Sequence, residues 1–378
     1  MEKFVQFLKK ELNIIKEKKR YRFLRTISSK PDFSITINSK KVLNLCSNNY
    51  LGLAGHPQLI EAEIEACKKY GVGSTGSRLI TGTMELHTLL EEKVARFKNC
   101  EKAILFNTGY MANIGILTSL TNEKDAIFSD EYNHASIVDG CKMSKATKFI
   151  YSHCNLEHLE SLLKKASKFR NRIIVTDSVF SMDGDIAPLP DIVFLAEKYN
   201  AFIMTDDAHA TGILGRNGSG SAEFFNLKDK IDIQMGTFGK ALGTFGAYVA
   251  GRKELIDFLI NKSRPLIYTT AMPPGTIGAT IKALEIVQSE EGKRRREYLL
   301  KMAGLLRETL NKHGLNTLNS QTQIIPLLIG DEETTMELSQ QLLEKGIFIQ
   351  GIRPPTVPEG MCRLRISLTV ATNFNALL

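Results

Sequence analysis

The sequence predicts an α/β protein in which a mainly parallel sheet is covered by helices on both faces. Two observations predict this class. From about residue 100, short apolar runs of strand length alternate with segments of helical periodicity. The chain is also long enough, with 378 residues of which 43% are hydrophobic, to bury a large core and to form more than one domain.

The segment before the main domain is expected to form a helix and a hairpin. Residues 1 to about 25 have helical periodicity and a basic end, and residues 33–37 and 42–45 have the pattern of two short paired strands. Residues 47–53 are polar and turn-rich, and residues 57–70 have helical periodicity. We therefore place an N-terminal segment at 1–48.

The main domain is predicted at 49–285 and a smaller α+β domain at 286–378. Helices are expected at 156–167, 191–199, 297–310 and 335–345, and the last residues, up to Leu378, are expected to begin another helix. In chain order, the expected strands are 103–106, 126–129, 148–151, 173–176, 202–205, 231–235, 247–250, 266–269, 324–328, 348–350 and 363–368.

Composition limits the class of protein. The N-terminus lacks the apolar centre of a signal peptide, and no apolar run has transmembrane length, so we expect a cytoplasmic protein without a membrane partner. The six cysteines contain no Cys-x-x-Cys pair, which favours reduced thiols. The net charge of +8 permits nucleic-acid binding, but no nucleic-acid motif accompanies the basic clusters.

Polar residues follow the expected strands, at the edge where open α/β sheets bind ligands. Small residues from Asn107 to Asn113 open a helix, which is typical of an anion site because backbone N–H groups and the helix dipole favour a phosphate. The other side chains found directly after these strands are His134, Asp177, Ser181, Asp206, Asp207, His209, Thr237 and Lys240.

Lys240 is the most informative of these residues. It lies between Gly239 and Ala241 after an apolar run, a position where a solvated charge is unusual. A desolvated lysine is a nucleophilic amine that can form a Schiff base. Pyridoxal phosphate (PLP) requires such an amine, a carboxylate for its pyridine nitrogen and a phosphate site. The strand ends offer all three.

Other interpretations of single motifs stay open at this point. Asp206, Asp207 and His209 could ligate a metal, although a second ligand cluster is missing from the sequence. Residues 71–76 fit the dinucleotide pattern G-x-G-x-x-G, but a helix and not a strand precedes them. A PLP-binding protein without catalytic activity is a further alternative.

Taken together, the motifs resemble the α-oxoamine synthase family of fold-type I PLP-dependent enzymes, from about residue 20 to residue 372. Two departures are Asp177, where many members carry Glu, and the Thr269 and Ala271 positions, which often carry serine. The matching stretches are SNNYLG at 47–52, GSTGSR at 73–78, FNTGY at 106–110, NHAS at 133–136, VFSMDGD at 179–185, TDDAHATG at 205–212 and TFGK at 237–240.

The resemblance implies roles for individual residues, with no metal. Lys240 binds the cofactor and acts as general base and acid, Asp206 pairs with the pyridine nitrogen, and His134 stacks on the ring. The remaining cofactor contacts are Ser181 and His209 at the ring hydroxyl, Gly109, Tyr110 and Thr237 at the phosphate, and Thr270 at the phosphate of a neighbouring subunit. The substrate contacts are Arg365, Asn48 and His134 for the amino acid and Arg22 and Thr356 for the acyl group.

The resemblance also implies a reaction, the decarboxylating condensation of an amino acid with an acyl thioester in a homodimer whose sites lie at the subunit interface. Residues 268–274 (YTTAMPP) and 352–358 (IRPPTVP) are similar to the members that use L-alanine and a pimeloyl thioester in biotin biosynthesis. The carrier of the acyl group is coenzyme A or acyl carrier protein. Glycine-using members, which make 2-amino-3-oxobutyrate or aminolevulinate, remain the alternative because one methyl group changes binding little.

Overall fold

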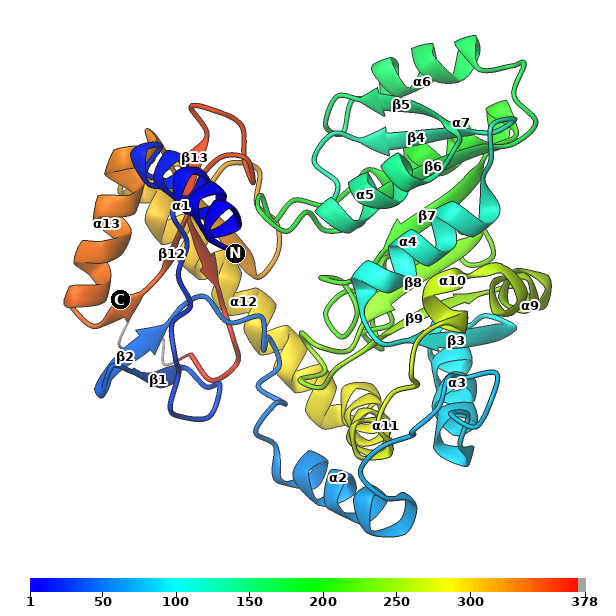
Figure 1. Ribbon diagram of the computed structural model, residues 1–378, viewed down its shortest axis with the longest axis horizontal. Helices are drawn as coiled ribbons and strands as arrows, with labels where there is room; N and C mark the ends of the chain where they lie inside the picture. Colours follow the sequence, from blue (N-terminus) through cyan, green and yellow to red (C-terminus); the bar gives the residue numbers. More distant parts are fainter. Residues whose placement is uncertain (373–378) are drawn as a thin grey trace.

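A computed structural model of the protein describes residues 1–372, and a seven-stranded sheet forms its centre (Figure 1). In sheet order the strands are β3 (Lys102–Phe106), β9 (Ala247–Gly251), β8 (Ile233–Thr237), β7 (Phe202–Asp206), β6 (Arg172–Asp177), β4 (Ala126–Asp130) and β5 (Thr147–Tyr151). The neighbours from β8 to β5 pair in parallel, whereas β9 is antiparallel to both β3 and β8. The predicted α/β class with a mainly parallel sheet is confirmed.

Helices cover both faces of this sheet. Successive side chains of a strand point to opposite faces, and apolar side chains on each face are buried against helices. In β6, Ile173 and Val175 are buried with Ile116, whereas Ile174 is buried with Leu159. The first of these faces is covered by α4 (Gly109–Leu120), α5 (Ala135–Met143), α9 (Lys253–Lys262) and α10 (Arg264–Ile267). The second is covered by α3 (Glu85–Lys98), α6 (Leu156–Lys165), α7 (Leu189–Tyr199), α8 (Ser221–Phe224) and α11 (Pro274–Gln288).

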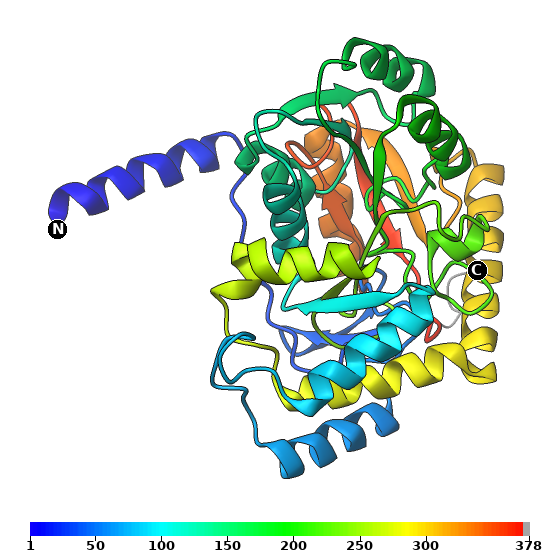
Figure 2. The ribbon, with the colours of Figure 1, turned by 90° about the vertical axis from the view of Figure 1, so that its right-hand side faces the viewer.

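The N-terminal helix α1 (Glu2–Glu17) extends away from the rest of the molecule (Figure 2). Each of its residues is at least partly exposed, including the apolar side chains of Phe4 and Phe7. The chain then forms the hairpin of β1 (Ser34–Ile37) and β2 (Lys40–Asn44) and the helix α2 (Pro57–Tyr70). None of the helices in residues 1–372 has the length and apolar character needed to cross a membrane.

Two small sheets lie beside the central one. One joins the N-terminal hairpin to the C-terminal part of the chain, because β11 (Ile347–Phe348) pairs in parallel with β2. The other has the antiparallel order β10 (Ile324–Gly330), β13 (Cys362–Ser367), β12 (Gln350–Ile352). Helices α12 (Glu290–Lys312) and α13 (Glu332–Glu344) accompany them. The domain boundaries at 48/49 and 285/286 stay predictions.

Several predicted elements need correction. Residues 266–269 were expected to form a strand, but they follow and partly belong to α10, where Pro265 occupies the first turn of a helix. The N-terminal helix ends at Glu17 and not near residue 25, and Lys19 adopts φ = +54°. The strand expected at 231–235 is β8 at Ile233–Thr237. The helix expected at the very end of the chain lies outside the described residues.

Candidate active site

A cavity of about 320 Å³ lies at the carboxyl ends of the parallel strands. Its walls come from the segments that follow β3, β4, β6, β7 and β8, as expected for an open α/β sheet. The predicted site residues that line it are Asn48, Gly109, Tyr110, His134, Ser181, Asp206, His209, Thr237 and Lys240.

Lys240 follows β8 in a tight turn that directs its amine into this cavity. Gly243 donates its backbone N–H to the Lys240 carbonyl at 2.9 Å and has φ = +67°. A Cβ atom on Gly243 would lie 2.3 Å from the backbone nitrogen of Ala54, so the turn requires glycine. Lys240 Nζ lies 3.0 Å from Nε2 of His209, and His209 Nδ1 lies 2.7 Å from the Tyr50 hydroxyl.

The electrostatic surroundings make Lys240 a reactive amine. Burial lowers the pKa of the Lys240 ammonium to about 8, even though Asp206 and Asp177 act in the opposite direction. Burial and the positive charge of Lys240 also lower the pKa of His209 well below its usual value, so that this ring is neutral near neutral pH. An uncharged imidazole beside it can accept a hydrogen bond from the Lys240 amine.

Asp206 ends β7 and is buried, with 3% of its surface exposed. One carboxylate oxygen accepts from the side-chain amide of Asn113 at 2.8 Å, and the other accepts from the backbone N–H of Ala208 at 2.9 Å. The next residue, Asp207, does not join this site. It accepts from the buried Lys98 ammonium at 2.7 Å, so Asp206, Asp207 and His209 do not form the metal site considered above.

His134 caps α5 and is fixed in one orientation. Its Nδ1 accepts from the backbone N–H of Ser136 at 3.3 Å and lies 2.7 Å from the Ser136 hydroxyl, which accepts from Asn113 at 2.8 Å. The backbone N–H of His134 donates to Asp177 at 2.7 Å. Burial lowers the pKa of His134, although Asp206 opposes the change, and the ring is therefore neutral near neutral pH.

The N-terminus of α4 forms a cradle at one end of the cavity. Thr108 caps the helix, and a Cβ atom on Gly109 would lie 2.8 Å from Cγ2 of Thr237. The Thr237 hydroxyl is buried and lacks a hydrogen-bond partner among residues 1–372. An unpaired hydroxyl beside the N-terminus of a helix fits an anionic group such as a phosphate. Tyr110 borders the cradle, and its hydroxyl donates to Asp139.

Arg365 reaches the site from β13 of the smaller antiparallel sheet. Its Nε donates to the Ser181 carbonyl, and both terminal nitrogens lie 3.3 Å from Oδ1 of Asn48. Its Nη1 also donates to the Ser367 hydroxyl at 2.7 Å. A guanidinium group placed in this way can bind a carboxylate with two hydrogen bonds.

Three predicted residues lie apart from this cavity. Arg22 is exposed in the segment between α1 and β1. Thr356 lines a neighbouring cavity of about 690 Å³, which shares His134 and Ser181 with the first. Thr270 is exposed, and its carbonyl accepts from the side chain of Asn107 at 2.8 Å. The glycine-rich segment 71–76 connects α2 to α3 without a preceding strand, unlike a dinucleotide site.

Comparison with known proteins identifies the family. A sequence model described as Aminotransferase class I and II matches residues 40–377. The chain belongs to this family. It is 51% identical over 358 residues to the 8-amino-7-oxononanoate synthase of Geobacter sulfurreducens, covering 95% of this chain and 92% of the relative. It is 46% identical over 369 residues to 8-amino-7-oxononanoate synthase 1 of Bacillus subtilis, covering 98% and 94%.

Solved structures agree with this family. A serine palmitoyltransferase from S. paucimobilis, with bound PLP–myriocin, matches with a TM-score of 0.91 and 30% identity over 97% of this chain and 92% of the other. The 8-amino-7-oxononanoate synthase from Francisella tularensis matches with a TM-score of 0.77 and 29% identity over 88% and 94%. The predictions of a fold-type I enzyme, of acyltransferase type and with PLP as cofactor, are confirmed.

The residues at the site fit this cofactor, and some of them were missed by sequence reasoning. The cradle of Gly109 and Thr237 suits its phosphate, and the buried Asp206 carboxylate suits a protonated pyridine nitrogen. Asn113 and Ser136 were not assigned a role, yet they connect Asp206 to His134. Ser136 lies inside a matching motif and Asn113 lies close to another, so the sequence weakly indicated that both are near the site. It did not indicate which residues they contact.

Proposed function

We propose that the protein condenses L-alanine with a pimeloyl thioester and releases carbon dioxide, the thiol carrier and 8-amino-7-oxononanoate, a step of biotin biosynthesis. The names of the relatives support this substrate pair. The observation that carries the proposal is the Lys240 amine, 3.0 Å from His209 in a cavity that Asp206 and His134 also line.

The chain holds the cofactor with residues from five strand ends. When bound, PLP supplies an electron sink that stabilises negative charge at the amino acid Cα. Lys240 would attach the cofactor, Asp206 would pair with its pyridine nitrogen, and His134 would stack on its ring. Its hydroxyl and phosphate would be held by Ser181, His209, Gly109, Tyr110 and Thr237.

Two arginines and three polar side chains bind the substrates. Arg365 binds the alanine carboxylate, with help from Asn48 and His134, because both of its terminal nitrogens lie 3.3 Å from Oδ1 of Asn48, which lines the cavity. Arg22 and Thr356 contact the acyl substrate, and Thr356 is supported by its place in the cavity next to His134.

Lys240 transfers the protons of the reaction. Its neutral amine would take the Cα proton of alanine, and the Cα electron pair would form the new bond to the thioester carbonyl carbon. The thiolate leaves and takes up a proton. Loss of carbon dioxide returns an electron pair to Cα, where the Lys240 ammonium delivers a proton. The pKa near 8 lets this side chain act in both directions near neutral pH.

The working unit is a cytoplasmic homodimer in which Thr270 contacts the phosphate bound by the neighbouring subunit. The exposed position of Thr270 supports a contact with another chain. Neither a nucleic acid nor a membrane is needed as partner, and the acyl group arrives on coenzyme A or acyl carrier protein.

Mass spectrometry of the products tests this function. Alanine and glycine are each offered with pimeloyl-CoA, pimeloyl acyl carrier protein, acetyl-CoA and succinyl-CoA, and Lys240→Ala serves as the inactive control. We expect 8-amino-7-oxononanoate from alanine and a pimeloyl thioester. Preferred formation of 2-amino-3-oxobutyrate or aminolevulinate from glycine would assign the chain to a sister activity instead.

A further inference from the structure

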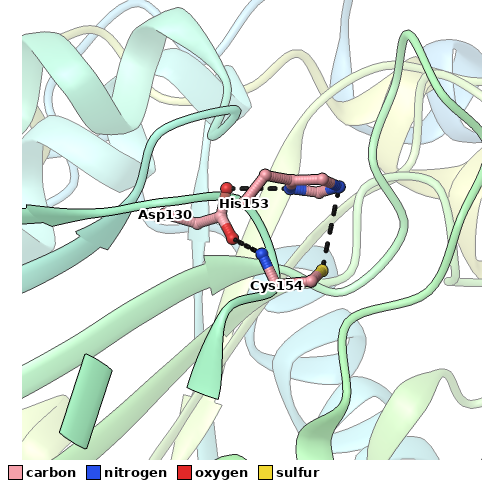
Figure 3. A group of neighbouring side chains, drawn as sticks. All are labelled: Asp130, His153 and Cys154. Atoms are coloured by element: carbon pink, nitrogen blue, oxygen red, sulfur yellow. Dashed lines mark hydrogen bonds and ion pairs between the residues drawn. The ribbon is translucent and has the colours of Figure 1, made fainter. Parts of the chain in front are cut away.

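His153 forms an ion cluster beside the active site that the reaction described above does not use. It lies after β5, and its imidazole is placed between two carboxylates. Nδ1 lies 3.0 Å from Oδ1 of Asp130 and Nε2 lies 2.8 Å from Oδ2 of Asp185. Figure 3 shows the first of these contacts, together with Cys154, whose backbone N–H donates to the other oxygen of Asp130 at 2.8 Å.

The surroundings of the ring favour its charged form. Tyr132 stacks on one side with ring centres 4.4 Å apart, and the edge contact with Phe180 has the same separation. Burial lowers the pKa of His153, but the hydrogen bonds to Asp130 and Asp185 outweigh it and raise the pKa to about 12. Both ring nitrogens therefore carry protons and donate. The titratable side chains that face the ring are Asp130, Asp185, Cys154 and Tyr132.

The same cluster could in principle hold a metal ion, since ligand atoms of Asp130, His153 and Cys154 lie within 4.8 Å of one another. A metal would have to displace the proton from a nitrogen that lies 2.8 Å from a carboxylate. It would also need the Cys154 thiolate, and burial raises the pKa of that thiol. The cluster therefore favours a proton over a metal.

The two carboxylates belong to the segments that carry His134 and Ser181. Asp130 ends β4, its side chain accepts from the backbone N–H of Tyr132 at 2.9 Å, and its carbonyl accepts from Asn133 at 3.2 Å. On the other side, the carbonyl of Asp185 accepts from the backbone N–H of Phe180 at 3.1 Å, which closes the turn that contains Ser181. His153 thus links the segments after β4 and β6 from the segment after β5.

We propose that His153 is a positioning residue that fixes His134 and Ser181 relative to each other by donating to Asp130 and Asp185 at the same time. This rests on the proposed roles of His134 and Ser181 at the cofactor ring. Neither residue touches His153 directly. The cation acts by holding the backbone of two segments whose side chains are proposed to contact the face and the hydroxyl of one rigid ring.

Three variants test the proposal by steady-state kinetics with saturating PLP. His153→Gln keeps a hydrogen-bond donor but loses the charge and the span between the carboxylates. We expect kcat to fall by about 10- to 100-fold, as for a small misplacement of catalytic groups, with a much smaller change in KM for alanine. Adding Asp185→Asn to this variant removes one unpaired carboxylate and should restore part of the loss. Cys154→Ser should behave like the wild type.

Some outcomes overturn the proposal. A lower melting temperature of His153→Gln with unchanged kcat would make the residue merely structural. If the purified protein contained stoichiometric metal that Cys154→Ser lost, the cluster would bind a metal and not a proton.

A measurement without turnover separates this proposal from the function itself. In histidine labelled with ¹⁵N, the signals missing from His153→Gln belong to His153, and at about pH 8 both nitrogens should have the chemical shift of a protonated imidazolium, although an ordinary histidine is neutral there. A neutral ring would refute the proposal. Failure of the wild type to make 8-amino-7-oxononanoate would refute the function and leave this result standing.

Discussion

At the scale of single residues, the site depends on buried polar groups that form hydrogen bonds with one another. Burial lowers the pKa of Lys240 and the pKa of His209, and the Asp206 carboxylate accepts hydrogen bonds from one side chain and one backbone N–H. Such groups are sensitive to the loss of a single partner, because an unpaired buried polar atom costs more than an average hydrogen bond gains. Two predictions concern buried groups of the site.

The first prediction is a pH dependence of cofactor attachment. In the role proposed for Lys240, only its neutral amine attacks the cofactor aldehyde, and burial lowers the pKa of this side chain from the ordinary 10.5 to about 8. The attachment rate should therefore be constant above this pKa and fall about tenfold for each pH unit below it. Stopped-flow absorbance of the apo-protein mixed with PLP measures the rate, with Lys240→Ala as the unreactive control. A rate that still rises steeply up to the ordinary lysine pKa would contradict the burial of this amine.

The second prediction concerns Asn113, which donates to both Asp206 and Ser136. Asn113→Ala should lower the free energy of unfolding by about 1–3 kcal/mol, because two buried acceptors lose their donor. Urea denaturation followed by circular dichroism measures the change. The exposed Asn261, which bonds the Asp257 carbonyl, offers Asn261→Ala as a control that should stay within about 0.5 kcal/mol of the wild type. Equal effects of the two substitutions would show that the Asn113 contacts are not important.

Site residues could be predicted from the sequence where the end of a strand determines the position of the residue. His134, Asp206 and Lys240 each follow their own strand, and parallel strands bring their carboxyl ends to one edge, so their meeting in one cavity could be predicted. Asn113 and Ser136 meet only because the N-terminal turns of α4 and α5 lie side by side, which no local pattern encodes. The substrate roles of Arg22 and Thr356 stay predictions.

At the scale of elements, the N-terminus of α4 and the end of β8 have to approach closely to form the cradle. Gly109 permits this approach because it has no side chain to collide with Thr237 and Met235. The short apolar run at 266–269 shows the limit of pattern reasoning at this scale. Periodicity cannot distinguish so short a strand from a helix turn, and the adjacent Pro265 was the better signal.

A third prediction follows from the cradle. In Gly109→Val, the new Cβ would lie 2.8 Å from Thr237 and 3.1 Å from Met235, so the strand and helix must move apart at the proposed phosphate site. Overpacking of this size should weaken PLP binding by about 10- to 100-fold. Equilibrium titration of the apo-protein with PLP measures the affinity. Gly304→Ala is the matched control, since its Cβ would meet only the end of Arg307, 4.0 Å away. Unchanged affinity in Gly109→Val would argue against this cradle.

At the scale of the whole molecule, the proposed homodimer would bury surfaces that are exposed in a single chain. The apolar side chains of Phe4 and Phe7 in α1 and the side chain of Thr270 are exposed in the single chain. A symmetric dimer that shares its sites makes each site depend on both chains.

The fourth prediction tests this sharing by subunit complementation. Lys240→Ala and Thr270→Arg should each be inactive as homodimers. When the two variants are unfolded together and refolded, one site of each mixed dimer has an intact Lys240 and an intact neighbouring Thr270. Random mixing should recover about one quarter of wild-type activity, because half of the dimers are mixed and half of their sites are intact. Recovery of no activity would show that each chain builds its site alone.

The contacts of strand β13 suggest a way to detect amino acid binding in this enzyme. Its residues Arg363 and Arg365 both grip the turn at 181–183, through the Asp183 carboxylate and the Ser181 carbonyl, so the smaller antiparallel sheet is tethered to the catalytic edge of the larger one. Energy transfer between two dyes, one on each sheet, would therefore measure a change in the distance between the sheets. It would register an incoming amino acid whose carboxylate competes for Arg365 before any chemistry begins.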